Sequence, residues 1–154
     1  MQEALKVGSK APDFSLLDQD GRQFKLYDLV GKKAIVLYFY PKDFTRYCTE
    51  EAHAFRDNYE VFTDAGAEVI GVSSDSVESH RKFASNLNLP YILLSDEGGK
   101  VRHLYKVAPV GDVPGRVTFV IDKKGAIRLM FSSMLEPRRH IEEALRIIEE
   151  ISKE

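Results

Sequence analysis

The chain contains the run Ala34-Ile-Val-Leu-Tyr-Phe-Tyr40, which is followed at once by Pro41-Lys-Asp-Phe-Thr45-Arg-Tyr-Cys48. The first part is nearly continuous apolar sequence, which is typical of a β-strand covered on both faces. The second part ends at the only cysteine of the chain, and apolar residues then recur with helical spacing. The sequence therefore predicts that Cys48 lies where a buried strand passes into a helix.

This position has chemical consequences for the thiol. In the first turn of a helix a side chain meets unpaired backbone N–H groups and the positive end of the helix dipole. Both favour the thiolate, which is the reactive form. Thr45 can direct its hydroxyl to the same place, and Pro41 supplies an apolar wall without an N–H donor. The arrangement suits redox chemistry on a small molecule, although a lone cysteine can also serve as a small buried side chain.

Outside this stretch the sequence predicts alternating strands and helices. Turn residues predict hairpins over residues 14–26 and 117–131. Further strands are expected over 68–73 and 90–94, and helices over 48–64, 75–87, 99–105 and 139–153, with Asp75 and Glu78 as a capping box. This order predicts an α/β protein with a thioredoxin-like fold: a central mixed β-sheet flanked by helices, with an N-terminal β-hairpin, in one domain over residues 1–154.

Composition narrows the function classes. Lys and Arg number 22 and Asp and Glu 24, so the net charge of −2 predicts neither nucleic acid nor an anionic membrane as a partner. Residues 1–6 contain neither a basic segment nor an apolar stretch of signal length. One cysteine agrees with a reducing compartment. We therefore expect a cytoplasmic protein.

The histidines give no sign of a metal centre. His53, His80, His103 and His140 are dispersed and lack zinc-ligand spacing, so neither a metal nor another cofactor is expected. A cysteine–histidine hydrolase would need a histidine beside Cys48. His53 is close in sequence, but on a helix it lies more than one turn away and faces another direction.

The pattern Pro41-x-x-x-Thr45-x-x-Cys48 resembles the peroxidatic signature of peroxiredoxins. Further blocks are similar to the peroxiredoxin Q branch, also called bacterioferritin comigratory protein, and follow in order: Ala11-Pro-Asp-Phe14, Gly71-Val-Ser-Ser-Asp-Ser76, Leu94-Ser-Asp96 and Arg116-Val-Thr-Phe-Val-Ile-Asp122-Lys-Lys-Gly125. The resemblance covers the chain from about Val7 to the last helix. It implies a thiol-dependent peroxidase, an antioxidant enzyme of cell redox homeostasis.

The resemblance also implies roles for individual residues. Cys48 would be the peroxidatic nucleophile, with Thr45 and Pro41 shaping its surroundings. Arg116 would hold the thiolate and stabilise charge on the peroxide oxygens, and Glu51 would position Arg116. Without the resemblance, Arg116 can equally be a surface cation, and Glu51 an acid that favours the positive end of its own helix.

Two positions depart from the branch. Arg46-Tyr47 stands where Pro-Gly is common, so a bulkier and charged pair flanks the thiol. His53 stands where many members have a resolving cysteine, and the chain has no other cysteine. An intramolecular disulfide is therefore impossible, and a one-cysteine mechanism follows.

The expected substrates are hydrogen peroxide and small organic hydroperoxides, including small alkyl hydroperoxides. The Cys48 sulfenic acid would be reduced by an external thiol, from a thioredoxin-like or glutaredoxin-like protein or a low-molecular-weight thiol. The protein is expected to be a monomer or a weak homodimer. Two other readings stay open: a peroxide sensor that relays oxidation to a partner, and a non-catalytic interaction module on a thioredoxin-like scaffold.

Overall fold

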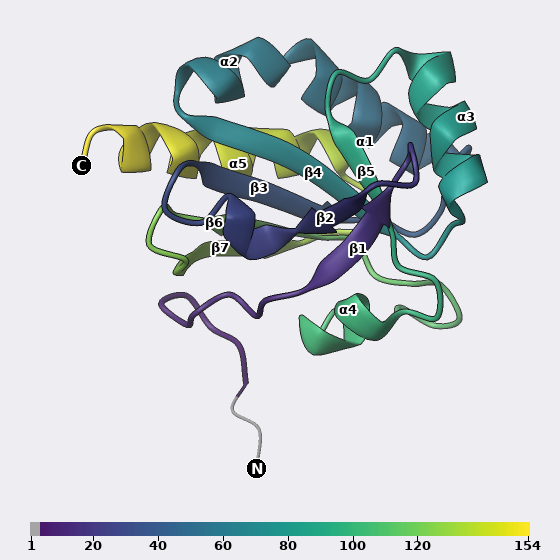
Figure 1. Ribbon diagram of the computed structural model, residues 1–154, viewed down its shortest axis with the longest axis horizontal. Coiled ribbons are helices and arrows are strands. Elements are labelled where there is room, and N and C mark those ends of the chain that lie inside the picture. The colour runs from purple at the N-terminus through teal and green to yellow at the C-terminus, as the bar shows by residue number, and fades with distance from the viewer. Residues whose placement is uncertain (1–3) are drawn as a thin grey trace.

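The computed structural model describes residues 4–154, which form a seven-stranded mixed sheet with helices on both faces (Figure 1). The strand order is β2-β1-β5-β4-β3-β6-β7. Strands β3, β4 and β5 are parallel to one another, whereas β1, β2, β6 and β7 pair antiparallel. The bounds are β1 Ser15–Asp18, β2 Gln23–Lys25, β3 Ala34–Phe39, β4 Ala67–Ser73, β5 Ile92–Ser95, β6 Val117–Ile121 and β7 Ile127–Ser132.

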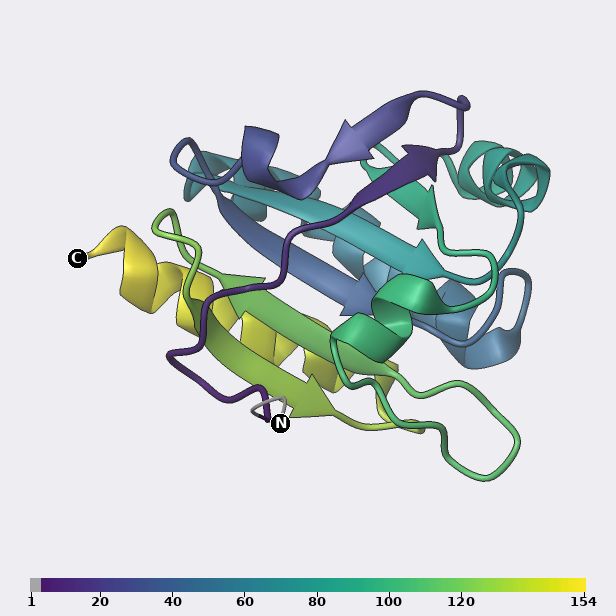
Figure 2. The same cartoon turned by 60° about the horizontal axis from the view of Figure 1, so that its bottom comes forward.

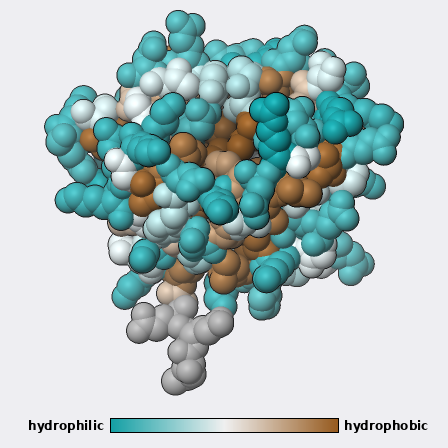
Figure 3. All heavy atoms as spheres, in the orientation of Figure 1, coloured by the Kyte–Doolittle hydropathy of each residue, from teal (hydrophilic) through white to brown (hydrophobic). Residues whose placement is uncertain are grey.

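The helices divide between the two faces of the sheet. Helix α5 packs on β6 and β7 and also contacts α1, while α4 lies on the opposite face, in front of the sheet in Figure 2. The helices are α1 Arg46–Asp57, α2 Tyr59–Asp64, α3 Val77–Leu87, α4 Lys100–Leu104 and α5 Pro137–Ser152, with a short 3-10 turn η1 at Leu26–Asp28. On the face seen in Figure 3, apolar residues gather in the middle and hydrophilic side chains surround them.

Strand β3 is the centre of the core, as its apolar run predicts. All six of its residues are buried. Val36 and Tyr38 belong to the hydrophobic cluster under α1 and α5, and Ile35, Leu37 and Phe39 belong to the cluster on the other face. The strand therefore holds both halves of the core together and ends beside the Cys48 turn.

The structure corrects some predicted boundaries. The helix expected over 48–64 begins earlier, at Arg46, and is divided at Asn58 into α1 and α2. Helix α3 is capped by Ser76, whose hydroxyl accepts the N–H of Ser79, and not by the predicted capping box that begins at Asp75. None of the helices in the described part of the chain has the length and apolar composition needed to cross a lipid bilayer.

Candidate active site

Cys48 lies in the first turn of α1, as the sequence predicted. Thr45 is the N-cap residue, with extended backbone, and its carbonyl accepts the N–H of Thr49 as the first helical hydrogen bond. The amides of residues 46–48 precede that bond, so the helix supplies no acceptor for them. Cys48 is 1% exposed. Its sulfur therefore lies near positive backbone charge and is shielded from bulk water.

The register of the sheet brings Arg116 to this turn. Strand β6 runs antiparallel to β3, and Val117 lies opposite Phe39. The residue before β6 is therefore beside the chain that leaves β3 toward Cys48. Arg116 is buried and donates from Nη2 to the Cys48 sulfur at 3.4 Å. The structure thus joins two residues that lie 68 positions apart in the sequence.

Glu51 fixes the other end of the guanidinium. It lies one turn after Cys48 on α1, is fully buried, and accepts a hydrogen bond from Arg116 Nη1 at 2.6 Å. Arg116 also donates from Nε to the carbonyl of Met134 at 3.1 Å. Burial alone would lower the pKa of Arg116, but Glu51 and Cys48 outweigh it and raise that pKa. Arg116 is therefore held as a cation against the sulfur.

Thr45 and Pro41 line the cleft in which Cys48 lies. The cleft has a volume of about 630 Å³. The Thr45 hydroxyl donates to the carbonyl of Lys42 at 2.7 Å, so its oxygen remains an acceptor. The apolar part of the wall consists of Pro41, Val113, Pro114, Met134 and Leu135, and the two unusual residues Arg46 and Tyr47 also line the cleft. The guanidinium of Arg46 lies 5.2 Å from the centre of the Tyr47 ring.

A second buried arginine, which the sequence did not reveal, joins the two sides of this site. Arg102 on α4 donates to the carbonyl of Tyr40 at 2.8 Å and to the carbonyl of Gly115 at 2.9 Å. These carbonyls directly precede Pro41 and Arg116. A Cβ at Gly115 would lie 2.3 Å from the carbonyl oxygen of Ala108, so the chain packs there too closely for a side chain. No sequence motif marks Arg102, because its partners are backbone carbonyls distant in sequence.

The second oxygen of Glu51 faces a buried histidine. Glu51 Oε2 has no hydrogen bond and lies 3.6 Å from His140 Nδ1. His140 Nε2 faces the carbonyl of Ser133 at 2.8 Å and therefore donates, while Nδ1 lies 2.8 Å from the Thr118 hydroxyl. Because burial lowers the pKa of His140 to about 4, Nδ1 carries no proton at neutral pH and accepts from that hydroxyl. The ring is therefore neutral. Burial raises the pKa of Glu51 to about 8, although Arg116 opposes the shift.

We expect His140 to make the protein sensitive to acid. Burial lowers the pKa of His140 from 6.5 to about 4. Between these values the unfolded chain binds a proton that the folded chain does not, so stability is full above pH 6.5 and falls as the pH approaches 4. A shift of this size corresponds to about 3 kcal/mol. This loss should appear in the free energy of unfolding in urea between pH 7 and pH 4 as a difference from a variant that lacks the imidazole, because Glu51 contributes in the opposite direction over the same range.

The matched variant is His140→Gln, which keeps hydrogen-bonding groups but does not titrate. Glu51 titrates in both proteins, and its raised pKa lowers stability as the pH rises from 4.5 to 8. Its contribution largely cancels in the difference between the two proteins. The advantage of wild type over His140→Gln should therefore shrink from pH 6.5 to pH 4. Parallel stability curves would show that His140 is not the titrating group.

Comparisons with known proteins agree with this geometry. The model of the AhpC/TSA family matches residues 7–130. A chloroplastic peroxiredoxin Q of Sedum lineare is 48% identical over 146 residues, covering 94% of this chain and 78% of that protein. The chloroplastic peroxiredoxin Q of Arabidopsis thaliana is 50% identical over 143 residues, covering 92% and 66%. The crystal structure of the peroxidoxin BcpB of Mycobacterium tuberculosis superposes with a TM-score of 0.89 at 35% identity, covering 96% of this chain and 98% of that one.

The comparisons confirm the predicted thioredoxin-like peroxiredoxin fold, and they overturn one expectation. The cytoplasmic location expected from the sequence is wrong on this comparison, because curated relatives at 48–50% identity are named as chloroplastic proteins. The expectation depended on composition, on residues 1–6 and on the single cysteine. A lone cysteine suits any compartment in which thiols stay reduced, so it does not identify one.

Proposed function

Because this chain belongs to the AhpC/TSA family, in its peroxiredoxin Q branch, we propose that the cleft at Cys48 is the site where it reduces peroxides. The protein is a thiol-dependent peroxidase, and with one cysteine it follows a one-cysteine mechanism. The observation that supports the assignment of the site is the 3.4 Å contact between Arg116 Nη2 and the Cys48 sulfur at the cleft.

The proposed reaction begins with the Cys48 thiolate, which attacks one oxygen of the peroxide in line with the O–O bond. The S–O bond forms, the O–O bond breaks, and the leaving oxygen takes a proton from water to depart as water or an alcohol. Sulfur is oxidised by two electrons to the sulfenic acid, and the peroxide is reduced. Arg116 would stabilise negative charge on the oxygens as the O–O bond lengthens.

Thr45 and Pro41 complete the proposed machinery. The Thr45 hydroxyl hydrogen is engaged by Lys42, so its oxygen is available to accept the O–H of a bound peroxide. That contact would fix the angle of attack. Pro41 contributes apolar surface beside the sulfur and has no N–H that would bind water there. Glu51 acts through Arg116 and is a positioning residue.

The cleft also supports proposals about partners. Its apolar wall suits the alkyl group of a small organic hydroperoxide as well as hydrogen peroxide itself. The reductant is proposed to be an external thiol, carried by a thioredoxin-like or glutaredoxin-like protein or by a small molecule. We further propose that residues 1–154 form one domain, since a single sheet carries both hydrophobic clusters. A monomer or weak homodimer is proposed for the quaternary state.

The one-cysteine mechanism predicts a trappable sulfenic acid. One equivalent of peroxide should give an intact protein whose mass, after reaction with dimedone, increases by one adduct at Cys48. Without a thiol, the oxidised protein can only persist, over-oxidise, or pair with Cys48 of another molecule. Adding a thiol should produce a mixed disulfide and then continuous turnover. Repeated turnover of peroxide with no reductant present would contradict the proposal.

A further inference from the structure

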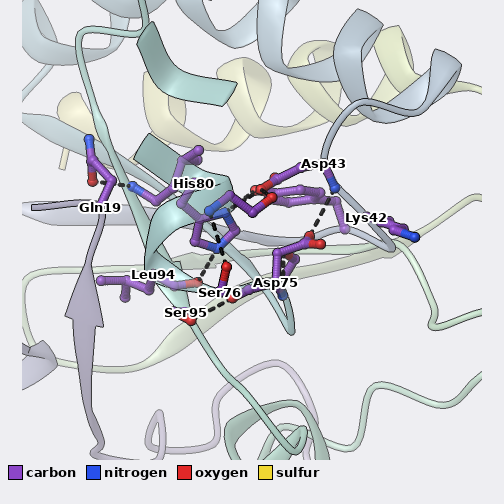
Figure 4. Close-up of polar contacts among 12 residues, drawn as sticks. Gln19, Lys42, Asp43, Asp75, Ser76, His80, Leu94 and Ser95 are labelled. Atoms are coloured by element: carbon purple, nitrogen blue, oxygen red, sulfur yellow. Dashed lines mark hydrogen bonds and ion pairs between the residues drawn. The ribbon is translucent and has the colours of Figure 1, made fainter. Parts of the chain in front are cut away.

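A buried polar cluster lies beside the Cys48 turn and adjoins the cleft, because one of its members, Asp75, also lines the cleft. Figure 4 shows Asp43, Asp75 and His80 coming together from the loop after β3, the loop after β4, and α3. His80 is 0% exposed and Asp43 is 3% exposed. Burying an acid and a histidine costs free energy unless both side chains find hydrogen-bond partners.

The hydrogen bonds of the cluster centre on the Asp43 carboxylate. Its Oδ2 lies 2.7 Å from His80 Nδ1 and accepts the Ser79 hydroxyl at 2.8 Å. Its Oδ1 accepts the Tyr40 hydroxyl at 2.6 Å. On the other side of the ring, His80 Nε2 faces the carbonyl of Leu94 at 2.9 Å and donates to it. A proton therefore lies between His80 Nδ1 and Asp43 Oδ2, and the side chain of Asp43 is held in place from α3 and from Tyr40, the residue after β3.

The backbone of Asp43 is held as well. Its N–H donates to Asp75 Oδ2 at 2.9 Å, and the same oxygen accepts the hydroxyl of Ser73 at 2.6 Å. Asp43, Asp75 and His80 place possible ligand atoms within 4.8 Å of one another, which is close enough for a metal ion. In each of the three residues, however, one possible ligand atom already takes part in a hydrogen bond inside the cluster. A structural clamp explains this arrangement better than a cation site does.

The residue after Asp43 is strained. Phe44 has φ of +61°, in the left-handed region that an aromatic residue rarely adopts. Its ring is half-exposed, although it meets the ring of Phe83 on α3 edge-on at 5.1 Å. Such backbone strain persists only where the surrounding contacts determine the conformation, and it gathers at functional sites. Thr45 comes next, as the N-cap of α1.

We propose that the Asp43–His80 pair is a positioning unit of the peroxidase site, which holds the strained turn at Phe44 and so sets Thr45 and Cys48 at the start of α1. The inference rests on the proposed function of the Cys48 cleft. Neither Asp43 nor His80 contacts the sulfur or the peroxide in this scheme. Their effect reaches Cys48 through residues 44 and 45, which form the shortest path between the clamp and the helix start.

The test compares His80→Ala with a control that weakens the core elsewhere, Ile35→Ala. Ile35 is buried near the start of β3, about 17 Å along the strand from Tyr40. Two readouts are needed on proteins shown to be folded by circular dichroism: kcat/KM for peroxide, and the pH midpoint of Cys48 alkylation by iodoacetamide. Because small misplacements of a reacting group are costly, His80→Ala should lower kcat/KM about 10- to 100-fold. The alkylation midpoint should move upward.

Ile35→Ala should leave both readouts at wild-type values while lowering the melting temperature. The conservative variant Asp43→Asn keeps an acceptor for Tyr40 and can donate to His80 Nδ1, but it loses the acceptor for the Ser79 hydroxyl. Its kcat/KM should therefore fall no further than that of Ser79→Ala, whereas Asp43→Ala should resemble His80→Ala. If His80→Ala does not fold, Ser79→Ala decides the question. It removes one hydrogen bond to Asp43 and should lower kcat/KM about two- to fivefold.

Three results would overturn the inference. The first is a folded His80→Ala protein with wild-type kcat/KM and alkylation midpoint. The second is a wild-type kcat/KM in Ser79→Ala. The third is stabilisation of the wild-type protein by Zn²⁺ that is lost in His80→Ala, which would make the cluster a metal site. Peroxidase activity in a Cys48→Ser protein would instead contradict the proposed function, so the two failures are distinguishable.

Discussion

Replacing Cys48 with serine is expected to remove peroxide consumption completely. A serine hydroxyl at neutral pH is a weak nucleophile unless a neighbouring base takes its proton. Arg116, whose side chain donates a hydrogen bond to this position, is held as a cation and cannot act as a base. The chain has no second thiol to replace Cys48. Peroxide loss, followed in the presence of excess thiol, should fall to the rate of the thiol alone.

The serine variant should also be well folded, because the change from sulfur to oxygen alters one atom of a buried side chain. Its circular dichroism spectrum and melting temperature serve as the control. With the fold intact, any peroxidase rate above the blank would mean that another group performs the chemistry. In that event the cleft at Cys48 would not be the active site.

Replacing Arg116 with alanine is expected to cause the second largest loss. A hydrogen bond to a charged group contributes about 1.5 to 3 kcal/mol, and removing one preorganised donor to a transition-state oxyanion costs about 10²- to 10³-fold in rate. We therefore expect kcat/KM to fall about 100-fold. The pH midpoint of alkylation should also move upward, because the thiolate loses a cation at 3.4 Å. Burial raises the pKa of Glu51 to about 8 although Arg116 opposes the shift, so without Arg116 the carboxyl stays neutral, which limits the cost to folding.

Comparing Thr45→Val with Arg116→Ala separates the placement of peroxide from the stabilisation of the thiolate. The Thr45 hydroxyl donates its hydrogen to the carbonyl of Lys42, which leaves its oxygen as an acceptor for the peroxide. Valine lacks this oxygen, so kcat/KM should fall because the peroxide is placed less well. The alkylation profile should stay close to wild type. Arg116→Lys should be intermediate, since it keeps the charge but cannot contact Glu51 and the sulfur together. An unchanged alkylation profile in Arg116→Ala would show that Arg116 does not hold the thiolate.

The sequence predicted the elements that depend on local pattern. The apolar run of β3 and the proline that follows it marked the strand end, and the helical spacing after Cys48 marked α1. The break at Asn58 was missed, because Phe55 and Phe62 keep the same spacing on both sides of it and both pack in one cluster. The cap of α3 was placed one residue early, since Asp75 turns its carboxylate toward Asp43 and Ser73.

The sequence predicted those residues of the candidate site that match the family's motifs. Cys48, Thr45, Pro41, Arg116 and Glu51 do meet at one end of the sheet, and their roles stay predictions. Arg102, His140 and the Asp43–His80 pair were not identified, although His80 and His140 had been noted as histidines. Their partners are carbonyls and side chains on other elements. Such contacts depend on the register and on the packing of helices, which one sequence read alone does not reveal.

From the antiparallel pairing of β3 with β6 we also expect a particular order in which the protein acquires its chemistry during folding. Contacts between residues far apart in sequence require the closure of a long loop and tend to form slowly. Strands β3, β4 and β5 can associate before β6 is in place, and Cys48 then has its helix but lacks its arginine. We therefore expect fast thiol reactivity to return late when the unfolded chain refolds, and to report the docking of β6 more directly than the recovery of helical structure does.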